Sequence, residues 1–309
     1  MPLAPEYEAM FAQLAEQEPA PPPIYEMTPE QGREMYRAMR AINPDLPIHK
    51  TEDRTIAGSQ GEIPVRIYTP AGPGPFGVLM YFHGGGWVIG DLDTSDAVCR
   101  EIATLAGVVV VSVDYRMAPE APYPAAVEDA YDATSWAAEN MAALNGNGKL
   151  GVTGESAGGN LSAVVSLKAR DNSGPDIAFQ CLLYPVTDCD WTRDSYKENG
   201  EGLLLETRTM EWFWDYYCPE EATRKEAYAS PLLASDLSNL PPALVVTAEF
   251  DPLRDEGEAY ASALAAAGND AGAVRYDGLV HDFFATAAVF QCSRPGFLAT
   301  IEAYKQHLN

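Results

Sequence analysis

The serine at position 156 lies in a segment whose residue types and spacing could support nucleophilic catalysis. Residues 154–158 read G-E-S-A-G; they follow the apolar run 150–153 and precede 157–165, which has the composition of a helix. A G-x-S-x-G sequence between a strand and a helix is typical of a nucleophile elbow, where a sharp turn exposes the serine hydroxyl above a sheet. The glycines relieve crowding at the turn, and the N–H after the serine would lie at a helix N-terminus, where negative charge is favoured. The pattern therefore predicts Ser156 as a nucleophile.

Three consecutive glycines form the second chemical feature. Residues 83–87 read H-G-G-G-W and follow the apolar run 76–82. Glycines let backbone N–H groups approach a ligand closely, and loops of this type form oxyanion holes in lipases and esterases. A flexible turn between a strand and a helix is the alternative, but the G-x-S-x-G segment in the same chain favours the oxyanion hole. His83 is expected to orient this loop rather than to act as a base.

The general base is sought after Ser156, because the acid and then the base follow the serine in chains with such an elbow. Of the four histidines, His49 and His83 precede the serine, and His307 is third from the C-terminus, where fraying disturbs geometry. His281 remains, just after the last expected strand. We therefore predict His281 as the base; a surface histidine without a catalytic role is the alternative.

The acid is sought near the apolar run 243–248. Asp251 follows that run and precedes a proline that stiffens the turn, so it is the preferred candidate. Glu249 and Asp255 are weaker candidates in the same stretch. Asp282 adjoins the expected base, but neighbours in sequence rarely point at one another.

Hydrophobic periodicity indicates the elements that must position these residues. Apolar runs that alternate with helical stretches predict a mostly parallel, doubly wound sheet flanked by helices. Expected strands lie at 63–68, 76–82, 108–113, 150–153, 177–186, 243–248 and 273–276. Expected helices lie at 28–42, 125–144, from 157 onward, 256–267 and 285–308. Pro64 favours an edge position for the first of these strands.

Two segments do not follow this alternation. Residues 1–45 are expected to form two short helices joined by a stiff, proline-rich linker at 19–23. Residues 188–230 are rich in aromatic side chains and are expected to form a helical cap over the sheet, because long insertions in compact domains are usually functional. An ordinary surface excursion is the alternative. The catalytic domain would then comprise 46–187 and 231–309, with the N-terminal helices contributing to the cap.

Composition narrows the functional classes. The 309 residues include 45 acidic and 20 basic ones, and the net charge of −25 would repel a phosphate backbone, so nucleic-acid binding is not expected. The five cysteines are odd in number and contain no C-x-x-C pair, so neither a disulfide framework nor a zinc site is indicated. The first 18 residues lack the features of a signal peptide, and no apolar run reaches the length of a membrane span. A cytoplasmic protein without membrane contact is expected.

The chain resembles the bacterial hormone-sensitive-lipase-like branch of the α/β-hydrolases over roughly residues 60–300. The resemblance rests on H-G-G-G-W at 83–87, D-Y-R-M-A-P-E at 114–120, G-E-S-A-G-G at 154–159, Y-P at 184–185 and D-P-L-R-D at 251–255. It implies Ser156 as nucleophile, His281 as base and Asp251 as the partner of the base. Two positions depart from the family pattern: Glu155, where Asp or Thr is more common, and Asp282, where Gly is more common.

The resemblance also implies an oxyanion hole. Its donors would be the N–H groups of Gly85, of Gly84 or Gly86, and of Ala157. The family carries a cap made from N-terminal helices and a later insertion, which agrees with the division given above. A triad of this kind needs neither a metal nor an organic cofactor.

The predicted function is that of a serine carboxylesterase, which hydrolyses short- to medium-chain acyl esters through an acyl-enzyme. A small-molecule ester is the expected partner, and Trp87 and Trp212 are expected to line its apolar pocket. A deacetylase or an amidase would use the same triad and remains an alternative. Gibberellin receptors resemble this family but have lost the catalytic histidine, so the presence of His281 disfavours a non-catalytic receptor. A homodimer through the last strand or helix is compatible with the family.

Overall fold

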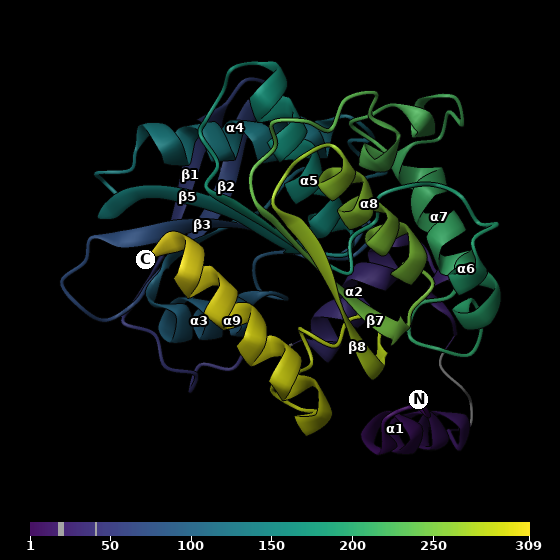
Figure 1. Ribbon diagram of the computed structural model, residues 1–309. Helices are drawn as coiled ribbons and strands as arrows, with labels where there is room; N and C mark the ends of the chain where they lie inside the picture. The colour runs from purple at the N-terminus through teal and green to yellow at the C-terminus, as the bar shows by residue number, and fades with distance from the viewer. Residues whose placement is uncertain (18–21, 41) are drawn as a thin grey trace.

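The structure, a computed structural model, describes residues 1–17, 22–40 and 42–309, and within these ranges an eight-stranded sheet forms the centre of the molecule (Figure 1). The strand order is β1-β2-β4-β3-β5-β6-β7-β8. The β1–β2 and β2–β4 pairs are antiparallel, and all other neighbours are parallel. The strands are β1 (Lys50–Gly58), β2 (Gly61–Thr69), β3 (Phe76–Phe82), β4 (Val109–Val113), β5 (Gly146–Glu155), β6 (Phe179–Leu183), β7 (Ala243–Phe250) and β8 (Ala271–Val280). The mostly parallel sheet predicted from the sequence is thereby confirmed.

Helices cover both faces of this sheet (Figure 1). One face carries α4 (Ala125–Glu139), α5 (Ala157–Asp171) and α8 (Arg254–Ala266), and the other carries α3 (Asp96–Ile102) and α9 (Arg294–Leu308). All five residues of β4 are buried, because a parallel sheet between two helical layers excludes water from both of its faces. The carboxyl ends of β3, β5, β6, β7 and β8 share one edge of the sheet, where ligands bind in open α/β folds.

Among the described residues, three helices precede β1, one helical turn lies between α3 and β4, and further short helices lie between β6 and α9. They are α1 (Pro5–Ala15), the 3₁₀ helix η1 (Ile24–Glu26), α2 (Pro29–Met39), the π-helical turn η2 (Ala103–Gly107), α6 (Asp194–Asn199), α7 (Thr207–Tyr217), and the 3₁₀ helices η3 (Thr223–Lys225), η4 (Pro231–Leu233) and η5 (Gln291–Ser293). Thr28 and Gln31 form a capping box that begins α2. No helix of the described ranges has the length and apolar content that crossing a bilayer requires.

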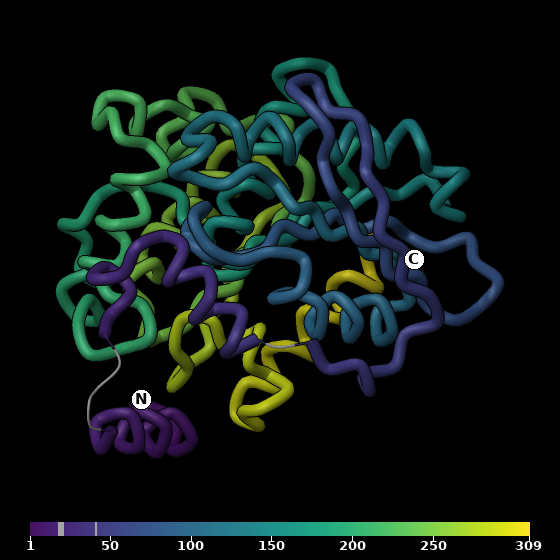
Figure 2. The backbone as a smooth tube through the Cα atoms, turned by 180° about the vertical axis from the view of Figure 1, so that it is seen from behind, coloured from purple at the N-terminus to yellow at the C-terminus, as the bar shows by residue number. Residues whose placement is uncertain are grey.

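The N-terminal helices pack against two different parts of the molecule. Helix α1 packs beside the C-terminal part of the chain, where the Tyr7 hydroxyl lies 2.7 Å from the Ser293 hydroxyl. By contrast, η1 contacts α7, and Figure 2 shows the purple segment with η1 and α2 beside the green segment 188–230. Of the predicted proline-rich linker, Pro19 and Pro21 lie outside the described residues. The division into a catalytic domain and a cap remains a prediction.

Four features of the elements were missed or predicted wrongly. Strand β1 was not predicted because its residues are largely polar and half-exposed, and only its pairing with β2 makes it a strand. Strand β2 is consequently not at an edge; Pro64 is tolerated because the pairing of β2 with β4 begins one residue later, at Val65. Helix α3 was not predicted, and the last helix begins at Arg294 rather than at 285.

Candidate active site

The elbow at Ser156 has the strand–turn–helix context that its motif predicts. Ser156 lies between β5 and α5 with φ 55° and ψ −114°, a left-handed backbone conformation that costs an L-residue energy. The Ser156 N–H donates to the carbonyl of Leu183 at 2.9 Å, and the N–H of Val186 donates to the carbonyl of Ser156 at 3.2 Å. A side chain at Gly158 would overlap the carbonyl oxygen of Phe82, so glycine is required where α5 meets β3. These contacts hold the strained turn in place.

The loop with the three glycines, residues 83–87 and here called the glycine loop, lies directly beside this elbow. Phe82, at the end of β3, pairs with Gly154 on β5, and a Cβ added at Gly84 would lie 3.2 Å from the carbonyl oxygen of Glu155. Gly85 and Gly86 have φ values of 114° and 58°, which glycine adopts without steric cost. Within the described ranges, the N–H groups of Gly85, Gly86 and Ala157 donate to no protein acceptor. Those N–H groups are therefore free to bind an anionic oxygen.

His83 is buried at the start of the glycine loop and contacts the loop backbone. Its ring stacks on Tyr115 at 4.3 Å, the Tyr115 hydroxyl donates to its carbonyl at 2.8 Å, and its Nδ1 lies 2.8 Å from the Gly84 carbonyl. Burial lowers the pKa of His83 to about 4, so its imidazole is neutral at ordinary pH. This surrounding accords with an orienting role.

Gly86 is a position of the loop at which a side chain is not tolerated. A Cβ there would overlap the ring of Phe213, a residue of α7. We expect Gly86→Ala to lower kcat by about 10²-fold or more, because the displaced loop loses its aim at the oxyanion. Gly107→Ala is the matched control, since Gly107 also has a positive φ (68°) but no atom within 4 Å of an added Cβ. For the control, urea unfolding should show a loss of about 1–2 kcal/mol in the free energy of unfolding, which comes from the backbone conformation alone. Ester kinetics should show the wild-type kcat for the control. Equal behaviour of the two variants would contradict the constraint at Gly86.

The expected base and acid are hydrogen-bonded to each other. His281 Nδ1 lies 2.8 Å from Asp251 Oδ2, and Asp251 is fully buried just beyond β7. The other Asp251 oxygen accepts from the Leu253 N–H at 2.8 Å, which fixes the carboxylate. The two weaker acid candidates lie elsewhere: Glu249 accepts from the Gly278 N–H at 2.7 Å, and Asp255 accepts from the Ser195 N–H at 2.8 Å. Of the three acids, the structure brings Asp251 to His281.

The surroundings of His281 favour its protonated form overall. Burial alone would lower the pKa of its imidazole, but the adjacent Asp251 carboxylate, together with Asp282 and Glu155, outweighs burial and raises the pKa. The ring of Tyr184, at the end of β6, lies 4.8 Å from the His281 ring, and Tyr184 itself has a positive φ of 35°. In the described part of the chain, Ser156 Oγ makes no hydrogen bond; catalytic hydrogen bonds are often long until a substrate is present.

Comparison with known proteins decides the family. A family model described as the α/β-hydrolase fold matches residues 79–285. The chain is a hormone-sensitive-lipase-like α/β-hydrolase. Carboxylic ester hydrolase LipN of Mycobacterium tuberculosis is 47% identical over 283 residues, which cover 88% of this chain and 75% of that protein. The ethyl acetate hydrolase of Pseudomonas putida is 36% identical over 300 residues, covering 93% and 92% of the two chains.

The solved structures agree with this family. The hyperthermophilic esterase from the archaeon Pyrobaculum calidifontis has a TM-score of 0.93 and 42% identity, and the match covers 99% of both chains. The predicted fold, the predicted family and the expected reaction class, carboxylic ester hydrolysis, are confirmed by these relatives.

An aromatic cluster of the hydrolase surrounds Trp87, one of the two residues expected to line the pocket. The side chain of Trp87 is fully buried; it stacks on Tyr217 at 4.0 Å and meets Trp214 edge-on at 5.1 Å. A side chain enclosed in this way supports the glycine loop, and a pocket role for Trp87 remains a prediction. Trp212 is partly exposed and packs edge-on against Phe213 at 5.3 Å, so a pocket role for Trp212 remains a prediction.

Sequence reasoning missed several residues of the site. Phe213 covers Gly86, Tyr184 packs against the base, and Arg40 reaches the site from α2. The aromatic richness of 188–230 was a signal for Phe213, but nothing in the local sequence marked Arg40.

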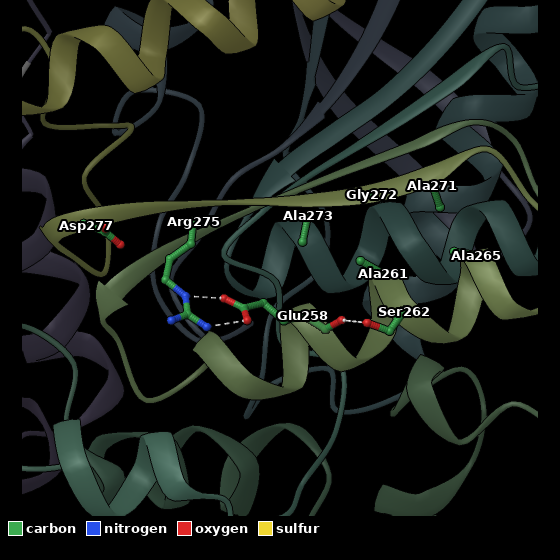
Figure 3. A pocket seen from close by; sticks show the side chains of 9 residues that line it. All are labelled: Glu258, Ala261, Ser262, Ala265, Ala271, Gly272, Ala273, Arg275 and Asp277. Atoms are coloured by element: carbon green, nitrogen blue, oxygen red, sulfur yellow. Dashed lines mark hydrogen bonds and ion pairs between the residues drawn. The ribbon is translucent and has the colours of Figure 1, made fainter.

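A large surface hollow of the hydrolase lies away from the site. It has a volume of about 540 Å³ and lies between α8 and the edge strand β8 (Figure 3). Figure 3 shows Arg275 and Glu258 paired in it, while small side chains such as Ala261 and Ala273 line the rest. None of its lining residues belongs to the elbow, the glycine loop or the His281–Asp251 pair. In the described ranges no cluster of three or more His, Cys, Asp or Glu side chains is arranged to hold a metal.

Proposed function

We propose that this hydrolase cleaves short- to medium-chain carboxylic esters through an acyl-enzyme formed on Ser156. The observation that carries the proposal is the 2.8 Å hydrogen bond between His281 and the buried Asp251, at the sheet edge that bears the elbow. A histidine held in this way by a carboxylate is the orienting arrangement of a serine hydrolase. It also disfavours a non-catalytic receptor, which would have no use for the pair.

Each group has one role in the proposed reaction. Ser156 Oγ attacks the ester carbonyl while His281 Nε2 takes the hydroxyl proton, and Asp251 holds the Nδ1–H tautomer. The oxyanion of the tetrahedral intermediate binds the N–H groups of Ala157 and of the glycine loop, Gly84, Gly85 and Gly86. His281 then gives its proton to the leaving alkoxide. In the second half of the reaction, His281 takes a proton from a water molecule, which attacks the acyl-enzyme. His281 then gives this proton to Ser156 Oγ as the carboxylic acid is released.

A restricted opening supports the preference for short acyl groups. Ser156 is 7% exposed and His281 is 8% exposed, and Phe213 and Trp87 pack around the glycine loop. The relative named ethyl acetate hydrolase acts, by its name, on a small ester. These features favour a compact acyl pocket near the elbow.

Hydrolysis of p-nitrophenyl esters from acetyl to dodecanoyl tests this function. We expect kcat/KM to be highest between acetyl and hexanoyl and to be lower by roughly tenfold or more on dodecanoyl, because a closed apolar pocket discriminates by about 1–3 kcal/mol per misfitting methylene. Intact-mass analysis after a phosphonate ester inhibitor should show one adduct on Ser156. A rate that rises steadily toward dodecanoyl would contradict the compact pocket, and labelling at another residue would contradict the acyl-enzyme.

We also propose a cytoplasmic location. All five cysteines lie within the described residues and are unpaired there, which is the usual state in a reducing compartment. Cell fractionation of the native host would test it, and recovery outside the cytoplasm would contradict it.

A homodimer through β8 is a further proposal. This strand is at the edge of the sheet, and Val274 on it is 43% exposed. An unpaired edge strand is a template for pairing with a second copy. Sedimentation at several protein concentrations should show the dimer, and a monomer at all of them would contradict it.

A further inference from the structure

Arg40, at the C-terminal end of α2, lies between two acids that come from distant parts of the chain. Its Nη1 lies 3.6 Å from Glu155 Oε2, and its Nη2 donates to Asp282 Oδ2. The Arg40 guanidinium also stacks over the Tyr36 ring at 4.6 Å. The Arg40 side chain is only 14% exposed, so these interactions are poorly screened by water.

Both acids adjoin proposed catalytic residues. Glu155 directly precedes Ser156, and Asp282 directly follows His281. Asp282 has a φ of 73°, a conformation that glycine adopts without steric cost. The two departures from the family pattern, Glu155 and Asp282, therefore meet at one guanidinium.

Glu155 depends on this cation because it is buried. Its side chain is 2% exposed; its Oε1 accepts from the Tyr81 hydroxyl, while its Oε2 has no hydrogen-bond partner among the described residues. Burial raises the pKa of Glu155, and the Arg40 charge opposes that shift. Removing one partner of a buried pair leaves an uncompensated charge, which is strongly unfavourable.

Arg40 is the last of three arginines on one face of α2. Arg33 and Arg37 precede it at helical spacing. Arg33 donates to the carbonyls of Val88 at 2.8 Å and Ala118 at 2.9 Å, just beyond the glycine loop. Arg37 Nε donates to Asp91 at 2.5 Å and is 54% exposed. Helix α2 is thereby attached to the glycine loop at one end and to the elbow and the base at the other.

We infer that Arg40 is a positioning residue for ester hydrolysis. By bridging Glu155 and Asp282, it holds the elbow at Ser156 and the segment that carries His281 in their relative positions. The inference rests on the proposed function of Ser156 and His281. Arg40 acts through its two acids and through the charge that it places near the imidazole.

The electrostatic consequence has a definite sign. The charged groups that face His281 are Asp251 beyond β7, Asp282 in its own loop, Glu155 at the end of β5 and Arg40 from α2. The three acids raise the pKa of His281, and two of them, Asp282 and Glu155, are paired with the Arg40 guanidinium, whose loss would leave their charges unopposed. Catalysis requires neutral His281, so a higher pKa moves the acid limb of the kcat/KM profile to higher pH.

Arg40→Gln should lower kcat by about 10- to 100-fold with KM little changed, because small misplacements of catalytic groups are costly. Its acid limb should move up by roughly half a pH unit. Asp282→Gly, which suits the positive φ and removes one acid, should move the limb in the opposite direction. The double variant Arg40→Gln/Asp282→Gly should bring the acid limb back toward that of the wild type.

Arg37→Gln is the matched control. Arg37 lies on the same helix and pairs with Asp91, so this variant breaks an ion pair but leaves Glu155 and Asp282 in place. It should leave kcat and the acid limb unchanged.

The outcomes separate the two proposals. Circular dichroism and urea unfolding establish that each variant is folded, and Arg40→Lys, which keeps the charge but cannot donate to both acids in one plane, should fall between wild type and Arg40→Gln. If Arg40→Gln keeps the wild-type kcat and acid limb while Ser156 remains essential, the inference about Arg40 is overturned and the proposed function stands. If Ser156→Ala hydrolyses esters as fast as the wild type, the proposed function itself fails.

Discussion

Replacing Ser156 with alanine is expected to lower kcat on activated esters about 10⁶-fold, because no other group can form the acyl-enzyme. The fold should persist, since Ser156 Oγ makes no hydrogen bond within the described residues and alanine is no more strained than serine at the same φ. Initial rates with p-nitrophenyl acetate would be compared with the burst expected from the wild type.

Ser162→Ala is the matched control for this substitution. Ser162 is fully buried on α5, and its hydroxyl donates only to the helical carbonyl of Gly158 at 2.9 Å. That variant should keep the wild-type kcat. Residual activity in Ser156→Ala within tenfold of the wild type would remove the acyl-enzyme from the mechanism.

Asp251→Asn is expected to lower kcat about 10⁴-fold while the fold remains intact. The amide could donate to His281 Nδ1, which would stabilise the tautomer whose Nε2 carries the proton and cannot accept one from Ser156. Loss of the carboxylate also removes the charge that raises the pKa of His281, so the remaining activity should have its acid limb at lower pH. A pH series of kcat/KM measures both effects.

The neighbouring acids provide controls for this experiment. Glu249→Gln and Asp255→Asn each remove a carboxylate from the same stretch, but neither carboxylate contacts His281. Both variants should retain kcat within about threefold, in keeping with the ordinary effects of losing exposed or half-buried polar contacts. A loss in either control as large as in Asp251→Asn would contradict the assignment of Asp251 as the orienting acid.

The parallel strands could be predicted because burial on both faces selects continuous apolar runs. Residues 109–113 and 243–248 are of this kind, and the structure places strands there. Strand β1 could not be predicted, because an exposed antiparallel strand keeps polar side chains and is stabilised by the register with β2. Local patterns predict elements that bury themselves, and they miss those that depend on a partner.

The proposed catalytic residues could be found because chain order and a short supply of histidines leave few candidates. The bridge through Arg40 could not, since the arginine and Asp282 are 242 residues apart and their pairing exists only after the sheet and α2 are assembled. The burial of Trp87 was missed for the same reason, because Tyr217 that covers it comes from α7. Long-range packing, rather than local propensity, decided these positions.

The positive φ values around the site bear on how this hydrolase could evolve. Seven non-glycine residues in the described ranges have positive φ, and Trp87, Ser156, Tyr184 and Asp282 among them surround the proposed catalytic groups. Each such residue costs roughly 1–2 kcal/mol, so the site as a whole opposes folding, and the surrounding core must compensate. Selection for heat resistance alone would relax these four positions first and would loosen the catalytic geometry as it did so. A thermostable descendant that keeps its activity must therefore gain its stability away from the carboxyl edge of the sheet.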